Sequence, residues 1–341
     1  MTTSETSTAS ERRVLLEVSG LKKQFPVRTG FRKKGFVSAV DGVSFTVREG
    51  TTLGVVGESG CGKSTAARLI LGLIKPDEGR IMFDGIDVQT IGGRERKALK
   101  RNMQMVFQDP YSALNPRASV HESISFPMRV QGYSRAETRE RVPALLEQVG
   151  LDPGHASYYP HQLSGGQRQR VNIARALALD PKLVVADEAV SALDKSVQAQ
   201  VLNLLKDLQE SLGLTYIFIS HDLNVVQYMA DRVAVMYLGH LVEECGAATL
   251  YDQPLHPYTR ALLAAIPDVD PDNNGEREAL EGEIPSPLNP PSGCRFRTRC
   301  PAVMAICAIE RPPLREVEPD HRVACHLYET EAVGEASLAV A

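Results

Sequence analysis

A glycine-rich turn near the amino terminus constrains the fold more than any other feature. It fits the pattern G-x-x-x-x-G-K-[ST] and reads Gly57, Glu58, Ser59, Gly60, Cys61, Gly62, Lys63 and Ser64, followed by Thr65. Apolar residues 52–56 precede the turn, and apolar residues at helical spacing follow it over 66–73. Glycines allow several backbone N–H groups to point inward, and a helix start adds its positive end. The pattern therefore predicts a phosphate-binding loop between a strand and a helix.

Two acidic residues after a later apolar run predict the catalytic half of the same site. Residues 183–186 have the character of a buried strand, and Asp187 and Glu188 come directly after it. Ligands of open α/β folds bind at the carboxyl edge of the sheet, where such a strand ends. We expect Lys63 to reach the β and γ phosphates of ATP, and Ser64 and Asp187 to hold Mg²⁺. Glu188 would polarise the attacking water as general base.

Strands alternate with helices on both sides of a helical middle section, which predicts an α/β fold with a mostly parallel sheet. Strand patterns cover residues 15–25, 37–47, 80–83, 103–107, 215–220 and 233–242, and helices are expected over 196–212 and 223–230. The helix over 196–212 would bury Val197, Val201, Leu204, Leu205, Leu208 and Leu212. From about residue 115 to 180 the pattern is helical, most clearly over 137–149, and indicates an inserted subdomain.

Composition divides the chain into four parts. Residues 1–13 are rich in Ser, Thr and Glu and lack the apolar core of a signal peptide, so we expect a disordered tail. Residues 14–265 would form the nucleotide-binding domain. Pro, Asp, Asn and Gly dominate after about residue 266, and a Cys-rich extension would run to 330, followed by a tail over 331–341.

Charge and hydropathy argue against two classes of function. The formal net charge is −4, so there is no global basic field and we expect no nucleic-acid partner. No run approaches the roughly 18 apolar residues of a membrane-spanning helix. We therefore expect a cytoplasmic protein that reaches a membrane only through partner subunits.

A second group of motifs narrows the kind of P-loop protein. The run Leu163, Ser164, Gly165, Gly166 and Gln167 resembles the signature motif of ABC ATPases. Gln108 looks like the Q-loop glutamine of that family, Asp194 like its D-loop aspartate, and His221 like its switch histidine. Phe25 occupies the place of an aromatic that stacks on adenine. Ala189 departs from the family's usual Pro after the catalytic Glu, but this position shapes the turn and we still expect hydrolysis.

The resemblance implies a P-loop NTPase of ABC type with an inserted helical subdomain and a small Cys-rich C-terminal module. Two such domains would pair head to tail, with ATP between the P-loop of one and residues 164–167 of the other, whose helix start completes the γ-phosphate site. Glu188 and His221 would carry hydrolysis, and Gln108 would contact Mg²⁺ and couple the site to membrane subunits. One P-loop and one signature are present, so the partner would be a second ATPase chain, either a paralogue or an identical copy.

Further stretches resemble the dipeptide and oligopeptide permease ATPases. Residues 108–117 read QDPYSALNPR and residues 256–263 read HPYTRALL, while ALDKSVQAQ over 192–200 favours the second, F-type ATPase of a two-ATPase system. This resemblance implies a peripheral subunit on the cytoplasmic face of the membrane that powers peptide import. Its partners would be two membrane permease subunits and an external substrate-binding protein.

Other functions share part of these features. Importers of nickel, glutathione or another solute carry the same motifs. A soluble ABC ATPase of translation or DNA maintenance is a second alternative, although such proteins usually have two ATP domains or a long coiled coil. A regulatory or redox-sensing module that merely retains ATP binding is a third, and the intact Glu188 and His221 argue against it.

Four cysteines in the Cys-rich extension predict a metal site. Cys294, Cys300, Cys307 and Cys325 are spaced C-x5-C-x6-C-x17-C. Four thiolates can hold a [4Fe–4S] cluster or Zn²⁺, and this spacing is wider than the tight pairs of zinc ribbons, which favours iron–sulfur. Four unligated, buried thiols are the structural alternative. Arginines that could offset the charge of a cluster lie nearby, at Arg295, Arg297, Arg299, Arg311, Arg315 and Arg322.

Overall fold

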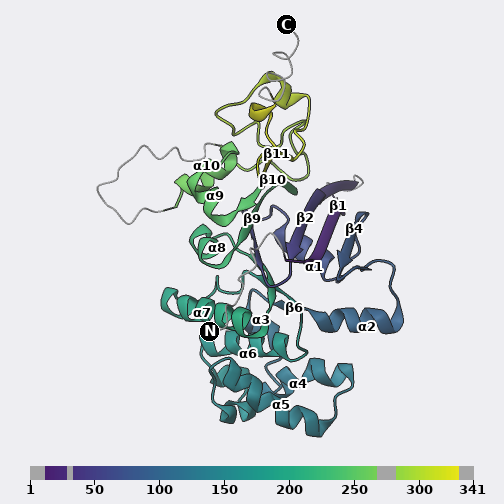
Figure 1. The fold of residues 1–341 in the computed structure, drawn as a ribbon, viewed down its shortest axis with the longest axis vertical. Helices are drawn as coiled ribbons and strands as arrows, with labels where there is room; N and C mark the ends of the chain where they lie inside the picture. Colours follow the sequence, from purple (N-terminus) through teal and green to yellow (C-terminus); the bar gives the residue numbers. More distant parts are fainter. Residues whose placement is uncertain (1–11, 29–33, 267–281, 330–341) are drawn as a thin grey trace, which may run out of the picture.

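The computed structural model describes residues 12–28, 34–266 and 282–329, whose strands form two sheets (Figure 1). The smaller, antiparallel sheet has the order β2-β1-β4-β5, with β1 (Val14–Arg28), β2 (Lys34–Arg48), β4 (Glu78–Phe83) and β5 (Ile86–Asp87). The larger sheet has the order β11-β12-β10-β9-β3-β8-β7-β6. Its strands are β3 (Thr52–Val56), β6 (Met103–Val106), β7 (Leu183–Asp187), β8 (Thr215–Ile219), β9 (Arg232–Tyr237), β10 (His240–Gly246), β11 (Arg315–Glu318) and β12 (His321–Val323).

The centre of the larger sheet is parallel, as predicted. Strands β6, β7, β8, β3 and β9 pair in parallel, so their carboxyl ends meet at one edge. β10 then pairs antiparallel with β9, and β12 pairs antiparallel with β10, with Glu243 opposite Val323. The Cys-rich segment is therefore joined to the ATPase sheet by backbone hydrogen bonds, which the composition shift after residue 266 did not predict.

Alternate residues of the central strands pack into two different cores, which is why these strands are apolar throughout. Val184, Ala186 and Phe218 belong to a core that includes residues of α6, α7 and α8. Leu183 and Val185 belong to the other core, which includes α1 and the smaller sheet. The helices of these layers are α1 (Lys63–Ile70), α6 (Gly165–Leu177), α7 (Lys195–Leu212) and α8 (Leu223–Met229).

The chain between β6 and β7 is helical, as predicted. Ser119, Ser134 and Ser164 each begin a helix with a reciprocal capping box, in which the serine and the Glu or Gln three residues later satisfy each other's backbone N–H groups. Figure 1 places α4, α5 and α6 at the end of the molecule opposite the C-terminal segment. This section contains α3 (Pro110–Ala113), α4 (Val120–Gln131), α5 (Arg135–Gln148), η2 (Pro153–Ser157), η3 (Pro160–Gln162) and α6, and α2 (Gly93–Asn102) precedes β6.

Two sequence predictions need correction. The helix that follows the loop begins at Lys63, but it ends at Ile70 rather than at residue 73, because Gly72 adopts a φ of 61° that an α-helix cannot continue. In α7 the buried stripe is Gln198, Val201, Leu202, Leu205 and Leu208, whereas Leu212 is 45% exposed. Leu212 is the last residue of the helix, so it lies beyond the part that packs on the sheet.

The remaining described helices are short and follow β10. They are α9 (Ala247–Asp252), α10 (Pro257–Ala264), η4 (Ala305–Ala308) and η5 (His326–Tyr328). None of the described helices combines the length and the hydropathy that a membrane crossing requires. Most of the predicted amino-terminal tail, the predicted tail over 331–341 and much of the linker after residue 266 lie outside the described residues.

Candidate nucleotide site

The glycine-rich turn joins β3 to α1, as predicted, and its shape depends on residues without a Cβ. Gly62 has a φ of 110°, and a Cβ there would lie 2.0 Å from the carbonyl oxygen of Ala39. At Gly57 a Cβ would lie 2.1 Å from the carbonyl oxygen of Met236. Lys63 folds back over the turn, where its Nζ donates to the carbonyl oxygens of Gly57 at 2.6 Å and Glu58 at 3.0 Å. The lysine is thus held at the loop.

Ser64 and Asp187 meet, although 123 residues separate them. The Ser64 hydroxyl donates to Oδ1 of Asp187 at 2.9 Å. Asp187 is only 4% exposed. Burial raises the pKa of its carboxyl, and the bond from Ser64 opposes this. A hydroxyl beside a buried carboxylate is an oxygen ligand pair that suits Mg²⁺, and a bound cation would relieve the burial of the charge.

Glu188 lies at the centre of three strand ends. Nε2 of Gln108 donates to its Oε2 at 2.7 Å, and Nδ1 of His221 lies 3.4 Å from its Oε1. The three residues follow β6, β7 and β8, which are neighbours in the sheet. Glu188 has a φ of 47°, a left-handed conformation that costs a non-glycine residue about 1 kcal/mol. A strained, hydrogen-bonded carboxylate at a sheet edge can orient a water for attack.

A cleft of about 250 Å³ opens beside these groups. Gln108 and Glu188 line it opposite the loop. Its other lining residues are Val37, Ser38, Ala39, Ser59, Gly60, Gly62, Lys63, Ser64, Thr65, Leu238 and Pro287. Gly57, Glu58 and Cys61 do not line it, although the loop pattern includes them. The sequence did not predict the lining residues Val37, Ser38 and Ala39 of β2, because no motif includes them. Leu238 and Pro287 were missed for the same reason.

The signature residues lie apart from this cleft. Ser164 begins α6 and its hydroxyl accepts from the backbone N–H of Gln167 at 3.2 Å, while Ser164 N donates to the Gln167 side chain at 2.9 Å. Gly166 faces α7, and a Cβ there would lie 2.5 Å from the Val197 side chain. None of the residues at 164–167, nor Asp194 or Phe25, lines the cleft. One chain therefore presents the loop and the signature at different places on its surface.

Comparisons with known proteins agree with this geometry. The family model described as ABC transporter matches residues 40–191, and the one described as oligopeptide/dipeptide transporter, C-terminal region, matches residues 242–307. The oligopeptide transport ATP-binding protein AppF of Bacillus subtilis is 53% identical over 327 residues, which covers 94% of this chain and 99% of that protein. This chain belongs to the ABC transporter ATPases. As a member, it has the family's P-loop fold and binds and hydrolyses ATP.

Other relatives point the same way. The putative oligopeptide transport ATP-binding protein YkfD of Bacillus subtilis is 54% identical over 318 residues, covering 92% of this chain and 95% of its own length. Among solved structures, the dimeric bacterial ABC transporter cassette MJ0796 superposes with a TM-score of 0.61 at 30% identity, covering 68% of this chain and 99% of that one. CbiO1 of Clostridium perfringens, part of the transporter complex cbiONQ, has a TM-score of 0.61 at 29% identity, with 70% and 91% covered.

The four cysteines of the Cys-rich segment lie near one another. Cys294 N donates to the carbonyl oxygen of Cys307 at 2.9 Å. Burial, and then the neighbouring thiols, raise the pKa of Cys325 to about 11. Among the described residues no three of the tail sulfurs lie within 4.8 Å of one another. A single zinc ion with Zn–S bonds of about 2.3 Å needs closer sulfurs than this.

The six arginines near the cysteines in sequence have specific partners in the structure. Most of them pair with carboxylates, several of these on the ATPase core. Arg295 and Arg311 pair with Asp41, Arg299 with Glu58, Arg315 with Glu329, and Arg322 with Glu244. Five of the six arginines predicted to offset the charge of a cluster thus have carboxylate partners, while Arg297 bonds to Ser292.

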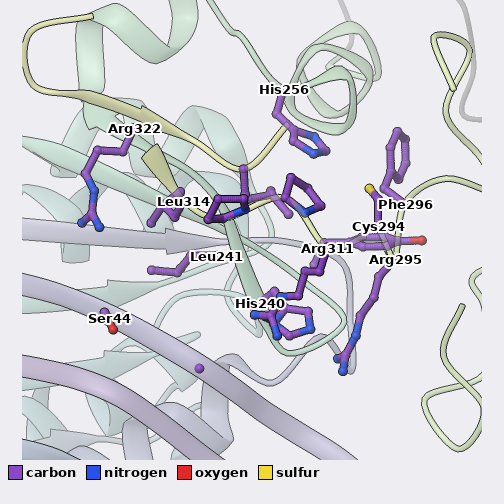
Figure 2. Close-up of a pocket in the computed structure, with 16 residues that line it drawn as sticks. Ser44, His240, Leu241, His256, Cys294, Arg295, Phe296, Arg311, Leu314 and Arg322 are labelled. Atoms are coloured by element: carbon purple, nitrogen blue, oxygen red, sulfur yellow. Dashed lines mark hydrogen bonds between the residues drawn. The ribbon is translucent and has the colours of Figure 1, made fainter. Parts of the chain in front are cut away.

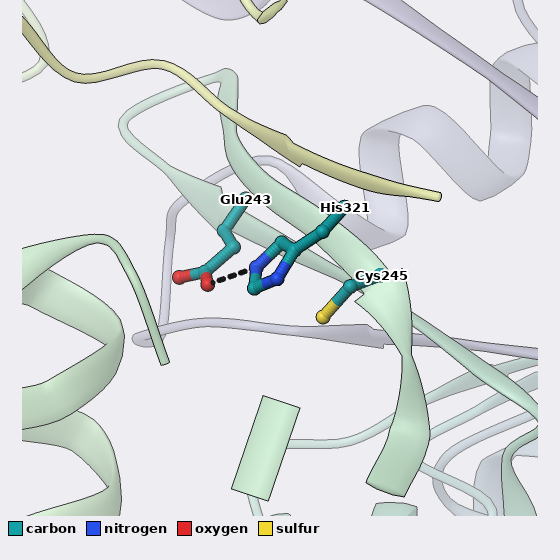
Figure 3. Close-up of side chains that lie close together, drawn as sticks. All are labelled: Glu243, Cys245 and His321. Atoms are coloured by element: carbon teal, nitrogen blue, oxygen red, sulfur yellow. Dashed lines mark hydrogen bonds and ion pairs between the residues drawn. The ribbon is translucent and has the colours of Figure 1, made fainter. Parts of the chain in front are cut away.

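One other side-chain group has a metal-like composition. Glu243, Cys245 and His321 lie together in the interior, as Figure 3 shows, with Nε2 of His321 2.7 Å from Oε1 of Glu243. The Glu243 carboxylate also accepts from the backbone N–H groups of Leu255 at 2.7 Å and His256 at 3.0 Å. Because protein donors already occupy the carboxylate, this group fastens β12 and the start of α10 to β10. Cys245 is packed in the interior.

Proposed function

We propose that this chain is the ATP-hydrolysing subunit that powers the import of dipeptides and oligopeptides through membrane permease partners. The observation that carries the proposal is the match of residues 242–307 to the oligopeptide/dipeptide transporter C-terminal region, on a chain in which Ser64 of α1 bonds to Asp187 and shares a cleft with Glu188. AppF and YkfD carry oligopeptide transport in their names. An importer of nickel, glutathione or another solute is the alternative.

The residues of the site take the following roles in this proposal. Ser64, Gln108 and Asp187 would hold Mg²⁺, which neutralises phosphate charge when bound. Lys63 and the loop N–H groups bind the β and γ phosphates. Glu188 accepts a proton from the attacking water, and the bond from Gln108 fixes the direction of its carboxylate. His221, on the next strand end, contacts the γ phosphate. Phe25 lies opposite Val37, which lines the cleft, and would stack on adenine.

The second half of each site would come from another ATPase chain. The start of α6, at residues 164–167, offers backbone N–H groups and a helix dipole to a γ phosphate, but does so away from this chain's own cleft. Asp194 would contact the same partner. The relative MJ0796 is a dimer in its structure. The partner is a paralogue or an identical copy.

The proposed import function also assigns membrane partners to the chain. Residues 14–265 would act as the ATPase domain, with residues 115–180 as an inserted helical subdomain that docks two permease subunits, and residues 266–330 as a Cys-rich module. The chain would lie at the cytoplasmic face of the membrane as a peripheral subunit, and an external binding protein would deliver the solute. A soluble, non-transport ATPase would instead show no association with permeases.

Reconstitution tests the substrate. The chain would be assembled in proteoliposomes with its partner ATPase, permeases and binding protein, and ATP-dependent uptake of a labelled dipeptide and a labelled pentapeptide measured beside nickel and glutathione. Peptide uptake that requires ATP supports the proposal. Uptake of nickel or glutathione alone would replace the substrate class while leaving the ATPase role intact.

We also propose that Cys294, Cys300, Cys307 and Cys325 hold a [4Fe–4S] cluster in preference to zinc. Each thiolate of such a cluster binds a different iron atom, and the thiols of Cys294, Cys300 and Cys307 lie near enough to Cys325 to raise its pKa, while their spacing in sequence is wider than that of zinc ribbons. Protein purified without oxygen should contain about four iron atoms per chain and absorb broadly near ~400 nm. A Cys307→Ser variant should lose iron, and a Cys245→Ser variant should keep it. Zinc alone, or no metal, would refute the cluster.

A further inference from the structure

Glu58 places a carboxylate inside the phosphate-binding loop. The loop pattern leaves this position free, and a negative charge near polyphosphate is unfavourable. The Glu58 side chain bonds away from the cleft, to Arg299 of the Cys-rich segment. Nη1 of Arg299 donates to Oε2 at 2.9 Å and Nη2 donates to Oε1 at 3.1 Å. The Arg299 side chain is 5% exposed and that of Glu58 21%, so the pair is shielded from water.

The backbone of Glu58 is held as firmly as its side chain. Its N–H donates to the hydroxyl of Tyr258 in α10 at 2.9 Å. Its carbonyl oxygen accepts from Nζ of Lys63 at 3.0 Å. The residue that Arg299 binds is therefore also a residue that positions the phosphate-binding lysine, so a displacement of Glu58 would reach Lys63 directly.

Arg299 is presented by a packed aromatic cluster rather than by a free loop. Its backbone N–H donates to the carbonyl oxygen of Phe296 at 2.9 Å. The Phe296 ring is 1% exposed and lies 5.3 Å from the ring of Tyr237, 5.4 Å from Tyr258 and 5.7 Å from His256, measured between centroids. Figure 2 shows Phe296 beside His256, and Arg311 in contact with His240. The position of Arg299 is thus fixed by aromatic residues of both the segment and the core.

A second contact joins the same segment to the cleft. Arg295 donates to the carbonyl oxygen of Leu238, which lines the cleft, and to Asp41 at 2.6 Å. Pro287, from the start of the segment, also lines the cleft. Residues 287–299 therefore contact the nucleotide site at several points, and Arg299 is the one that binds the loop itself.

We propose that Arg299 is a positioning residue for nucleotide binding, which neutralises and orients Glu58 so that the Cys-rich segment sets the affinity of the P-loop for ATP. The proposal rests on ATP binding at this loop. Without Arg299, an uncompensated carboxylate stands in the loop, on the same residue whose carbonyl oxygen binds Lys63. The consequence is weaker ground-state binding of ATP, while Glu188 and Gln108 keep their arrangement.

Equilibrium ATP titration of the purified full chain at fixed Mg²⁺ tests this. Arg299→Gln should weaken ATP binding about tenfold, because a shielded carboxylate near the phosphates is left unpaired. Arg297→Gln is the matched control: it lies in the same segment but bonds to Ser292, and should bind ATP normally. In the assembled transporter, Arg299→Gln should raise the KM for ATP and leave kcat within about a factor of two.

Variants of Glu58, the residue that Arg299 binds, separate an effect of charge from an effect on folding. Glu58→Gln removes the repulsive carboxylate and should bind ATP more tightly than the unaltered chain. The double variant Glu58→Gln, Arg299→Gln should recover the affinity lost in Arg299→Gln to within about twofold. A double variant as weak as Arg299→Gln, or an Arg299→Gln variant that binds like Arg297→Gln, would overturn the proposal.

Two further results keep the test decisive. If Arg299→Gln does not fold, as judged by thermal unfolding, Glu58→Gln decides alone, and weaker ATP binding by that variant refutes the proposal. Lys63→Ala should abolish ATP binding in the same assay. If Lys63→Ala binds ATP normally, the assignment of the P-loop itself fails, and that failure is distinguishable from the failure of Arg299 as a positioning residue.

Discussion

Replacing Phe296 with alanine should loosen the Cys-rich segment from the ATPase core. The ring is 1% exposed and contacts Tyr237, Tyr258 and His256. Loss of a fully buried phenylalanine costs about 3–5 kcal/mol, since the removed contacts leave a cavity. We expect a loss of about 4 kcal/mol, a large share of the 5–15 kcal/mol that typically stabilises a domain.

Urea unfolding followed by circular dichroism measures this loss. Ile309→Ala is the matched control in the same segment, because Ile309 is 77% exposed and should change the free energy of unfolding by less than about 0.5 kcal/mol. The backbone carbonyl oxygen of Phe296 accepts the N–H of Arg299, and the packed ring holds that backbone in place, so Phe296→Ala should raise the KM for ATP by loosening Arg299. A loss below about 1 kcal/mol, together with an unchanged KM, would show that the aromatic cluster does not anchor the segment.

The remaining predictions concern the loop, the metal ligand and acid stability. Gly62→Ala should abolish ATP binding in titration, because its Cβ would clash with Ala39, whereas Gly213→Ala, with open space around it, should cost only about 1 kcal/mol of stability. Asp187→Asn should raise the melting temperature of the nucleotide-free chain, because burial raises the pKa of this carboxyl, and should abolish Mg²⁺-dependent hydrolysis. Burial raises the pKa of Glu243, but the His321 bond and backbone donors outweigh it and lower the pKa below 4.5. The stability this contributes is present above pH ~4.5 and lost as pH falls through the folded value, so Glu243→Gln should flatten the pH dependence of unfolding below that pH.

Sequence patterns could predict the catalytic half of the site because its parts are local. The loop at residues 57–65 is one continuous motif between a strand and a helix. Asp187, Glu188 and His221 each follow a strand, and parallel strands end at a shared edge, so their meeting follows from the fold class. The order of strands, which makes β6, β7 and β8 neighbours, is seen only in the structure, because strand patterns in the sequence do not say which strands pair.

The contacts of the Cys-rich segment could not be predicted in this way. Arg299 and Glu58 are 241 residues apart. Neither residue is part of a periodic pattern, and neither is a residue type that a motif requires. The pairing of β12 with β10 is equally hidden, because β12 spans only His321–Val323. The cysteine spacing predicted a shared site, but the distances between the sulfurs depend on turns that hydrogen bonds such as Cys294 to Cys307 fix.

The predicted buried face of α7 also differs in part from the observed one. Apolar spacing predicted Val201, Leu205 and Leu208 correctly, and Val197 and Leu204 are partly buried against the same core. It failed at Leu212, which is exposed, and it missed Gln198 and Leu202, which are buried. A helix with leucines around much of its circumference has no unique apolar face in sequence.

The central claim is that hydrolysis at Glu188 powers solute uptake. The most direct measurement follows ATP hydrolysis and peptide uptake in the same proteoliposomes, with the unaltered chain, with Glu188→Gln and with Glu210→Gln, an exposed glutamate on α7, as control. We predict that hydrolysis and uptake fall together in Glu188→Gln, by about 100-fold, while ATP binding persists. Undiminished peptide uptake by the Glu188→Gln transporter would contradict the claim.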